Sequence, residues 1–82
     1  MDRHITTGIY RHFKGILVEV LHFGIHTETE EPCVVYKHID TGKIWIRPLA
    51  MFVSKVDREK YPDATQEYRF EFVKSKEENN EN

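Results

Sequence analysis

Residues 33–48, CVVYKHIDTGKIWIRP, contain two runs of β-forming residues on either side of a polar turn, and this stretch decides the fold class of the chain. Asp40-Thr41-Gly42 is the turn, because aspartate and glycine are favoured turn residues and separate the two apolar runs. Pro48 ends the second run, since proline has no N–H to donate to a sheet. The stretch therefore predicts an antiparallel hairpin.

The turn residues also predict how the two strands pair. A two-residue type I′ loop would place Thr41 at positive φ, which a β-branched residue resists, whereas a three-residue loop needs positive φ only at Gly42. We therefore expect Ile39 to pair with Lys43. One face of the hairpin then holds Val34, Tyr36, His38, Ile44 and Ile46, and the other holds Val35, Lys37, Lys43, Trp45 and Arg47. We assign the first face to the core and the second to the surface.

Alternation of apolar and polar residues predicts further strands along the chain. Together with the hairpin, the expected strands cover residues 16–25, 33–39, 43–47 and 67–74, after an extended segment at 9–14. The alternation in the first of these strands changes phase, so we expect a bulge near Val20–His22. In the last strand, Tyr68, Phe70 and Phe72 alternate with charged residues and should face the core.

Short strands joined by tight turns define the predicted fold class. Residues 49–56 fit either a turn followed by a short strand around 51–56 or a single helical turn, and no segment predicts a long helix. We expect an all-β fold of about five strands, either a small SH3-like barrel, our first choice, or a strongly bent antiparallel sheet. This single β domain should span residues 1–74, and the apolar-free segment 75–82 should form a disordered acidic tail.

Length, charge and cysteine content limit the function classes. A chain of 82 residues has a thin core, which suits a shallow binding surface better than a buried enzyme cleft. Its net charge of -2 argues against bulk, non-specific nucleic-acid binding. One cysteine, Cys33, excludes an internal disulfide and a cysteine-based zinc site, so we expect a small buried residue there. Without a membrane-spanning run or a signal-peptide core, the sequence predicts a cytoplasmic protein.

Trp45 and Arg47 are the strongest candidates for a functional surface. They lie two residues apart on a strand, so their side chains share one face, where an indole and a guanidinium can stack a ring and pair with an anion. We expect them to form the centre of a binding surface together with Lys37. Further candidate binding residues are Lys43, Tyr10, His12, His26, Thr27, Glu28 and Thr29. The alternative, in which Trp45 fills one end of a barrel with Arg47 stacked on it, stays open.

The polar loop 26–31 contains residue types that support a second class of function. His26 could act as a base for the hydroxyl of Thr27 or Thr29, and His22 with His26 and a nearby glutamate could hold a metal. However, adjacent residues rarely aim at one point, and the two histidines lie about 13 Å apart on an extended strand. We therefore favour a structural loop whose side chains bond its own amides, and we predict no catalytic residue, no bound metal and no cofactor.

Several short motifs, taken in order along the chain, resemble one small bacterial family. They are YRHFKG at 10–15, VL at 20–21, HTET at 26–29, VVY at 34–36 and WIRPLAMF at 45–52. The resemblance is to the family catalogued as domain of unknown function 1653, and it covers roughly residues 8–57. It implies a bacterial, cytoplasmic protein and brings no activity with it.

Two classes of function remain open on the sequence alone. The first is a non-catalytic recognition module that binds an anionic or peptide partner on the Trp45 face. For this module a protein or a small anionic ligand is the favoured partner, and single-stranded nucleic acid is the alternative. The second class is a small hydrolase or metal-dependent enzyme centred on the 26–31 loop. Exposure of Trp45 favours the first class, and convergence of His26 with a carboxylate in a concave pocket favours the second.

Overall fold

The computed structural model describes residues 5–75, which form one antiparallel sheet and a single turn of helix. The elements are β1 (Gly8–His12), β2 (Leu17–Ile25), β3 (Pro32–His38), β4 (Ile44–Pro48), α1 (Leu49–Phe52) and β5 (Phe70–Lys74). The strand order across the sheet is β4-β3-β2-β1-β5, so β4 and β5 are its edges. Apart from Ser75, the predicted tail lies outside the described residues.

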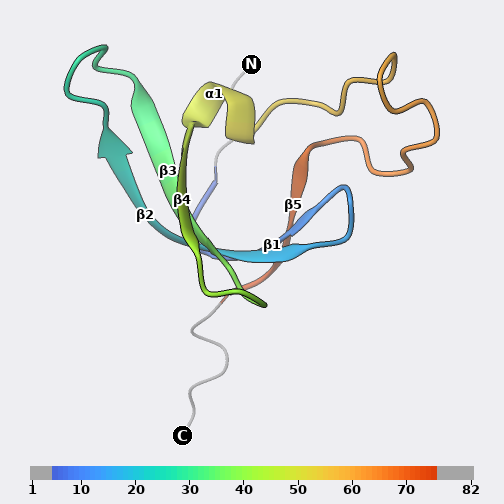
Figure 1. Ribbon diagram of the computed structural model, residues 1–82, viewed down its shortest axis with the longest axis horizontal. Coiled ribbons are helices and arrows are strands. Elements are labelled where there is room, and N and C mark those ends of the chain that lie inside the picture. Colours follow the sequence, from blue (N-terminus) through green and yellow to red (C-terminus); the bar gives the residue numbers. More distant parts are fainter. Residues whose placement is uncertain (1–4, 76–82) are drawn as a thin grey trace, which may run out of the picture.

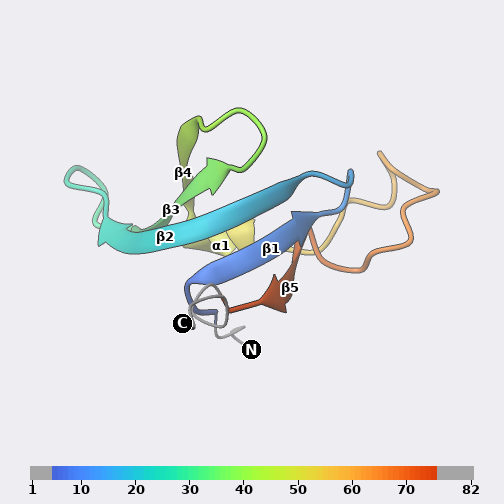
Figure 2. The same ribbon diagram turned by 90° about the horizontal axis from the view of Figure 1, so that it is seen from below.

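The sheet is strongly bent and open. It curves into a U with α1 over its open side, as Figure 1 shows from the front and Figure 2 from below. Within residues 5–75 the two edge strands do not pair with each other, so the sheet does not close into a barrel. The all-β prediction is confirmed in the form of a strongly bent antiparallel sheet. No helix in the same residues is long and apolar enough to cross a membrane.

The core fills the inner face of the bend. Its buried side chains come from β1, β2, β3, α1 and β5: Tyr10, Val18, Val20, Val34, Tyr36, Phe52 and Phe70. Phe52 and Phe70 stack with 4.0 Å between ring centroids and 5° between their planes. Tyr36 meets these two rings nearly edge-on, at 5.5 and 5.6 Å. Aromatic packing therefore ties the helix and the last strand to the middle of the sheet.

β2 carries the predicted bulge. Its pairing register with β3 shifts between Val20 and His22. Val18 and Val20 are buried before the bulge, and after it Phe23 pairs with Val34 and so returns to the inner face. The bulge lets this long strand follow the bend of the sheet while its apolar side chains change phase.

The hairpin between β3 and β4 departs from the predicted register by one residue. Tyr36, rather than Lys37, lies opposite Trp45. Gly42 has the expected left-handed conformation, with φ of 77°, but the loop also includes Ile39. The longer loop satisfies its own polar groups, since the Gly42 N–H donates to the last carbonyl of β3 at 2.8 Å.

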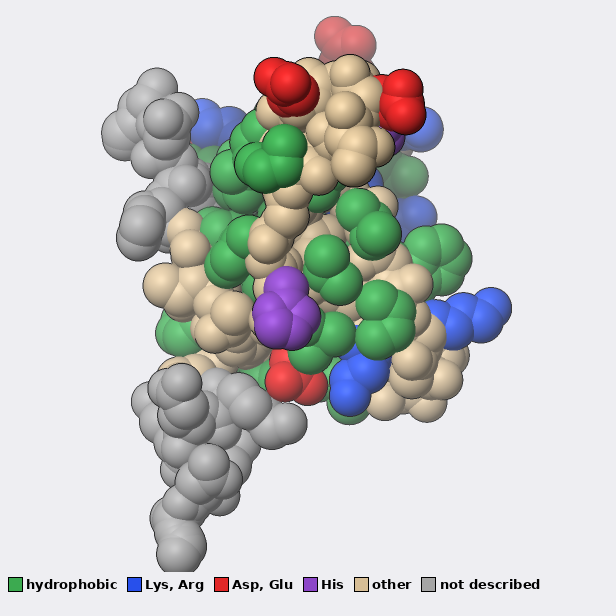
Figure 3. Space-filling view, turned by 90° about the vertical axis from the view of Figure 1, so that its left-hand side faces the viewer, with side chains coloured by type: hydrophobic (Ala, Val, Ile, Leu, Met, Phe, Trp, Pro, Cys, Tyr) green, Lys and Arg blue, Asp and Glu red, His purple; other side chains and the backbone are tan. Residues whose placement is uncertain are grey.

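This shift exchanges the predicted core and surface faces of β4. Trp45 and Arg47 lie on the inner face beside Tyr36, whereas Ile44 and Ile46 lie on the outer face with 56% and 68% of their surface exposed. The assignment of the two isoleucines to the core is wrong, because α1 covers the inner side of this edge strand instead. Figure 3, which views the β2 side of the molecule, shows hydrophobic side chains at the surface of the sheet.

The segment after β4 turns back over the sheet as a helix. Residues 49–56 begin with the helical turn α1, so of the two alternatives the short strand is wrong. Phe52 in α1 is buried, and Leu49 and Val53 pack against the core at its margin. Val56 is also buried, but it lies beyond the helix, where its N–H donates to the Glu67 carbonyl at 2.9 Å. The helix thereby supplies the aromatic ring that fills the open side of the bend.

The predicted aromatic stripe of the last strand is correct only in part. β5 begins at Phe70, and Tyr68 before it forms an isolated bridge to Lys55. Phe70 faces the core with 1% of its surface exposed, as predicted. Phe72 also faces the core side, where it pairs with Tyr10 and packs against its ring, but 51% of its surface remains exposed. Its strand is an edge strand, which leaves one side of the ring uncovered.

We expect Phe70→Ala to destabilise the fold by about 3–5 kcal/mol, because it removes the ring stacked on Phe52 and leaves a cavity between α1 and β5. Phe72→Ala on the same strand is the matched control and should cost much less, since that ring is half exposed. Urea denaturation followed by circular dichroism measures both free energies of unfolding. Equal losses in the two variants would contradict this description of the core.

Candidate anion-binding pocket

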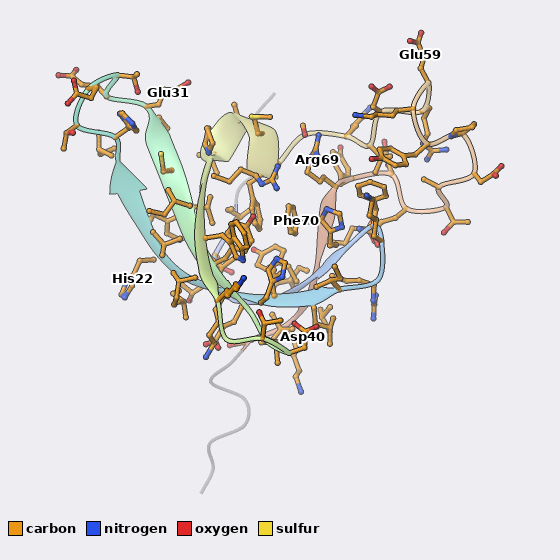
Figure 4. All side chains as sticks on the ribbon, in the orientation of Figure 1. His22, Glu31, Asp40, Glu59, Arg69 and Phe70 are labelled. Atoms are coloured by element: carbon orange, nitrogen blue, oxygen red, sulfur yellow. The ribbon has the colours of Figure 1, made fainter. Side chains whose placement is uncertain are left out.

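A cavity opens on the inner face of the bend, beside the aromatic core. It has a volume of about 230 Å³ and is lined by His12, Lys14, Ile16, Tyr36, His38, Arg47 and Phe70. We call it the basic pocket. The lining residues belong to β1, the β1–β2 turn, β3, β4 and β5, so only the folded sheet brings them together. Figure 4 shows the Phe70 ring pointing into the bend at this level.

Arg47 is held in the basic pocket by the aromatic core. Its Nε donates a hydrogen bond to the Tyr36 hydroxyl at 3.2 Å, and its guanidinium carbon lies 5.8 Å from the centre of the Phe70 ring. A guanidinium has five N–H donors in one plane, and within residues 5–75 this is the only hydrogen bond that they make. Arg47 is therefore a preorganised donor for a carboxylate or a phosphate.

The basic pocket concentrates positive charge without a facing carboxylate. None of its lining residues within the described chain is an aspartate or glutamate. The ion pairs Lys37–Glu19 and Lys55–Glu67 join residues elsewhere on the molecule. Like charges held close together disfavour one another unless an anion neutralises them. The pocket is therefore suited to an anionic group.

The pKa of His12 is affected by both burial and the positive charge of the pocket. The pKa of His12 is lowered from its ordinary 6.5 to about 4; burial is the largest cause, and the nearby positive charges contribute in the order Arg47, Arg69, Lys14 and His38. The Nδ1 atom of His12 accepts the backbone N–H of Lys14 at 3.1 Å, so the proton of the neutral ring is on Nε2. At neutral pH, His12 therefore contributes an uncharged N–H donor to the pocket.

Trp45 lies next to the basic pocket. Its ring packs against His38, a lining residue, with 5.6 Å between centroids, and 45% of its surface is exposed. Trp45 and Arg47 share the inner face of β4, as their spacing predicts. Trp45 is thus a half-exposed ring beside a charged cavity rather than a core residue, and one side of it can stack on a partner.

Three predicted members of the binding surface lie elsewhere. Lys37 is on the outer face, where its Nζ is 3.8 Å from Oε1 of Glu19, and its expected place in the centre of the site is wrong because of the register shift. Tyr10 is 2% exposed in the core, where its hydroxyl donates to the Thr6 carbonyl at 2.8 Å, so it cannot contact a ligand. Lys43 follows the hairpin loop and does not line the pocket.

The 26–31 loop is built by its own hydrogen bonds and does not line the basic pocket. The Nδ1 atom of His26 accepts the backbone N–H groups of Glu28 and Thr29 at 3.1 and 3.2 Å. The Thr29 hydroxyl accepts the backbone N–H of Glu31 at 3.2 Å. Figure 4 shows Glu31 at the far end of β3 from the hairpin turn. These contacts match the structural interpretation of the loop.

The same contacts bear on the alternative of a catalytic or metal site in this loop. The hydroxyl of Thr29 is directed to Glu31 rather than to His26, and Thr27 is exposed at the loop surface. Within residues 5–75 there is no group of three or more His, Cys, Asp or Glu side chains placed to hold a metal ion. The geometry brings no base and nucleophile together at this position.

Sequence reasoning did not include Lys14 and His38 in the site. Lys14 alternates with His12 on one face of the first strand, so the pattern at 9–14 contained the signal. His38 lies on the face of Val34 and Tyr36, as the alternation along its strand predicts, but the expected register placed Ile44 rather than Trp45 beside it. With the observed register, His38 shares the inner face of the sheet with Trp45.

Fold and site together define a small all-β protein with an open, bent sheet and a basic pocket on its inner face. The chain belongs to the family described as protein of unknown function (DUF1653), whose model matches residues 8–72. The crystal structure of a protein of this family from Bordetella bronchiseptica is similar, with a TM-score of 0.73 and 28% sequence identity over 87% of this chain and 90% of that chain. No curated protein matches the chain.

The lowered pKa of His12 predicts that the free energy of unfolding decreases as the pH falls from about 6.5 to about 4. The unfolded chain binds this proton more tightly than the folded chain does, so acid favours unfolding across that window. His12→Gln should remove part of this dependence, whereas His22→Gln, at an exposed position, should not. Urea denaturation at a series of pH values measures the effect. An identical pH dependence in wild type and His12→Gln would contradict the assignment.

Proposed function

We propose that the protein is a non-catalytic recognition module that binds an anionic group in the basic pocket. One observation carries the proposal: Arg47 is fixed against Tyr36 and Phe70 in a cavity that it shares with Lys14 and that no carboxylate faces within residues 5–75. A guanidinium prepared in this way binds an anion without a large loss of side-chain entropy.

The size of the cavity indicates how much of a partner it accepts. At about 230 Å³ it is smaller than the roughly 300–1,000 Å³ typical of sites that enclose a whole small molecule. It therefore suits one functional group, a phosphate or a carboxylate, that belongs to a larger partner. The exposed face of Trp45 offers a second contact next to the cavity, where an apolar or planar part of the partner can pack.

We also propose that the protein acts in the cytoplasm of a bacterium. Cys33, which is buried, has a free thiol, and this suits a reducing compartment. The related crystal structure comes from a bacterial protein.

Inorganic phosphate is the probe that tests anion binding. When phosphate enters the basic pocket, its negative charge should raise the pKa of His12 from about 4, which a titration of the His12 ring by NMR measures. Arg47→Gln should weaken phosphate binding by about tenfold or more, because a charge-assisted, bidentate contact is lost. Arg11→Gln is the matched control, since Arg11 is exposed on the opposite face of the sheet and the variant loses the same charge.

Lys14→Gln is a second test of the proposal, which is needed if the Arg47→Gln variant does not fold. Lys14 is exposed and lines the pocket, so its replacement should weaken phosphate binding without a loss of stability. If phosphate bound equally well to wild type, Arg47→Gln and Lys14→Gln, the basic pocket would not be the binding site and the proposal would be wrong.

A further inference from the structure

A second hollow lies beside the basic pocket and contains aromatic rings. Its volume is about 350 Å³, and its lining consists of Phe13, Lys14, Lys60, Tyr61, Pro62, Asp63 and Ala64. We call it the aromatic groove. Phe13 and Tyr61 meet edge-on with 4.9 Å between ring centroids. Figures 1 and 2 both show the loop between α1 and β5 lying alongside the β1–β2 turn, which brings these two rings together.

The aromatic groove adjoins the basic pocket. Lys14 lines both, and its Nζ lies 5.0 Å from the centre of the Tyr61 ring and 5.9 Å from that of Phe13. The ring of Phe13 also packs on His12, a lining residue of the basic pocket, at 4.6 Å. A single ligand can therefore place one part in each cavity and contact Lys14 where the two cavities meet.

Two rings thus approach the basic pocket from different parts of the fold: Trp45 is exposed, and Phe13 is half-buried. Trp45 reaches it from β4 through His38, and Phe13 reaches it from the β1–β2 turn through His12. The cations Arg47 and Lys14 line the basic pocket itself. Trp45 therefore offers one aromatic surface for stacking, Phe13 offers a second, and the basic pocket offers an anion site.

The charges that line the basic pocket and the aromatic groove favour a ligand with more than one negative charge. The basic pocket has no acidic lining residue within residues 5–75, and in the aromatic groove the carboxylate of Asp63 is accompanied by two lysines, Lys14 and Lys60. Lys60 Nζ lies 6.0 Å from the centre of the Tyr61 ring, so a cation accompanies the platform itself. A ligand with planar rings joined by anionic groups matches both cavities at once.

We propose that the basic pocket and the aromatic groove are adjoining subsites for single-stranded nucleic acid. One backbone phosphate lies between Arg47 and Lys14, and the flanking bases stack on Trp45 and on the Phe13–Tyr61 pair. Unstacked bases are needed, so a duplex does not fit. This inference rests on the proposed anion site and names its ligand class. It also agrees with the net charge of -2, because a site that contacts about one or two phosphates needs no basic surface of large extent.

Quenching of Trp45 fluorescence measures this binding, since Trp45 is the only tryptophan of the chain. The probes are inorganic phosphate, thymidine monophosphate, a single-stranded tetranucleotide of DNA, the same length of RNA, a short duplex and a tetraglutamate peptide. We expect at least one of the single-stranded tetranucleotides to bind at least about tenfold more tightly than the mononucleotide, because it uses both ring platforms. A preference between DNA and RNA identifies the natural strand.

Tyr61→Ala separates this inference from the proposed function. The variant should lose about fivefold or more in tetranucleotide affinity and keep its phosphate affinity, and Tyr61→Phe should restore tetranucleotide binding because the ring returns. Phe23→Ala is the matched control: Phe23 is an exposed ring on the inner face that lines neither cavity.

Two kinds of result would overturn the inference. If phosphate binds through Arg47 but Tyr61→Ala leaves tetranucleotide affinity unchanged, the anion site stands and the nucleic-acid assignment is wrong. Tighter binding of the duplex or of tetraglutamate than of either single strand would also reject it. If none of the probes binds in an Arg47-dependent way, the proposed function fails as well.

Discussion

The stack of Phe70 on Phe52 is the contact on which the rest of this structure depends. The two rings lie parallel at 4.0 Å and join the last strand to the helical turn that follows β4. An open sheet of this length cannot bury its inner face against itself, so another element must cover it. α1 and β5 supply these rings, and Tyr10 and Tyr36 close around them edge-on.

The candidate site is an extension of this same packing. Arg47 lies over Phe70 and is bonded to the Tyr36 hydroxyl, and His12 packs edge-on against Phe70 at 4.9 Å. The rings that stabilise the fold therefore also determine where the pocket's donors point. Support from such closely packed neighbours holds the geometry of the site in a chain of 82 residues, whose core is thin.

The positive charges in and around the basic pocket repel one another and so lower the stability of the fold. Arg47, Arg69 and Lys14 all disfavour protonation of His12, and no carboxylate among the lining residues within 5–75 relieves them. Local arrangements that cost stability are commonly found where a protein binds a partner, since the ligand then supplies the missing interaction. By contrast, the 26–31 loop, which is richer in reactive residue types, uses its histidine and Thr29 to satisfy its own amides. Residue type alone did not distinguish these two regions.

Local sequence patterns were enough to predict the all-β class, the bulge at Val20–His22, the left-handed Gly42 and the shared face of Trp45 and Arg47. Each of these follows from local alternation, from turn chemistry or from the period of a strand. Tertiary structure alone decided which face of β4 is buried. Alternation divides a strand into two faces but does not say which one meets the core, and a shift of one residue in pairing reverses the answer. It also decided that Lys14, His38 and Arg47 meet in one cavity, because their strands are brought together only by the bend of the sheet and the packing of Phe52 on Phe70.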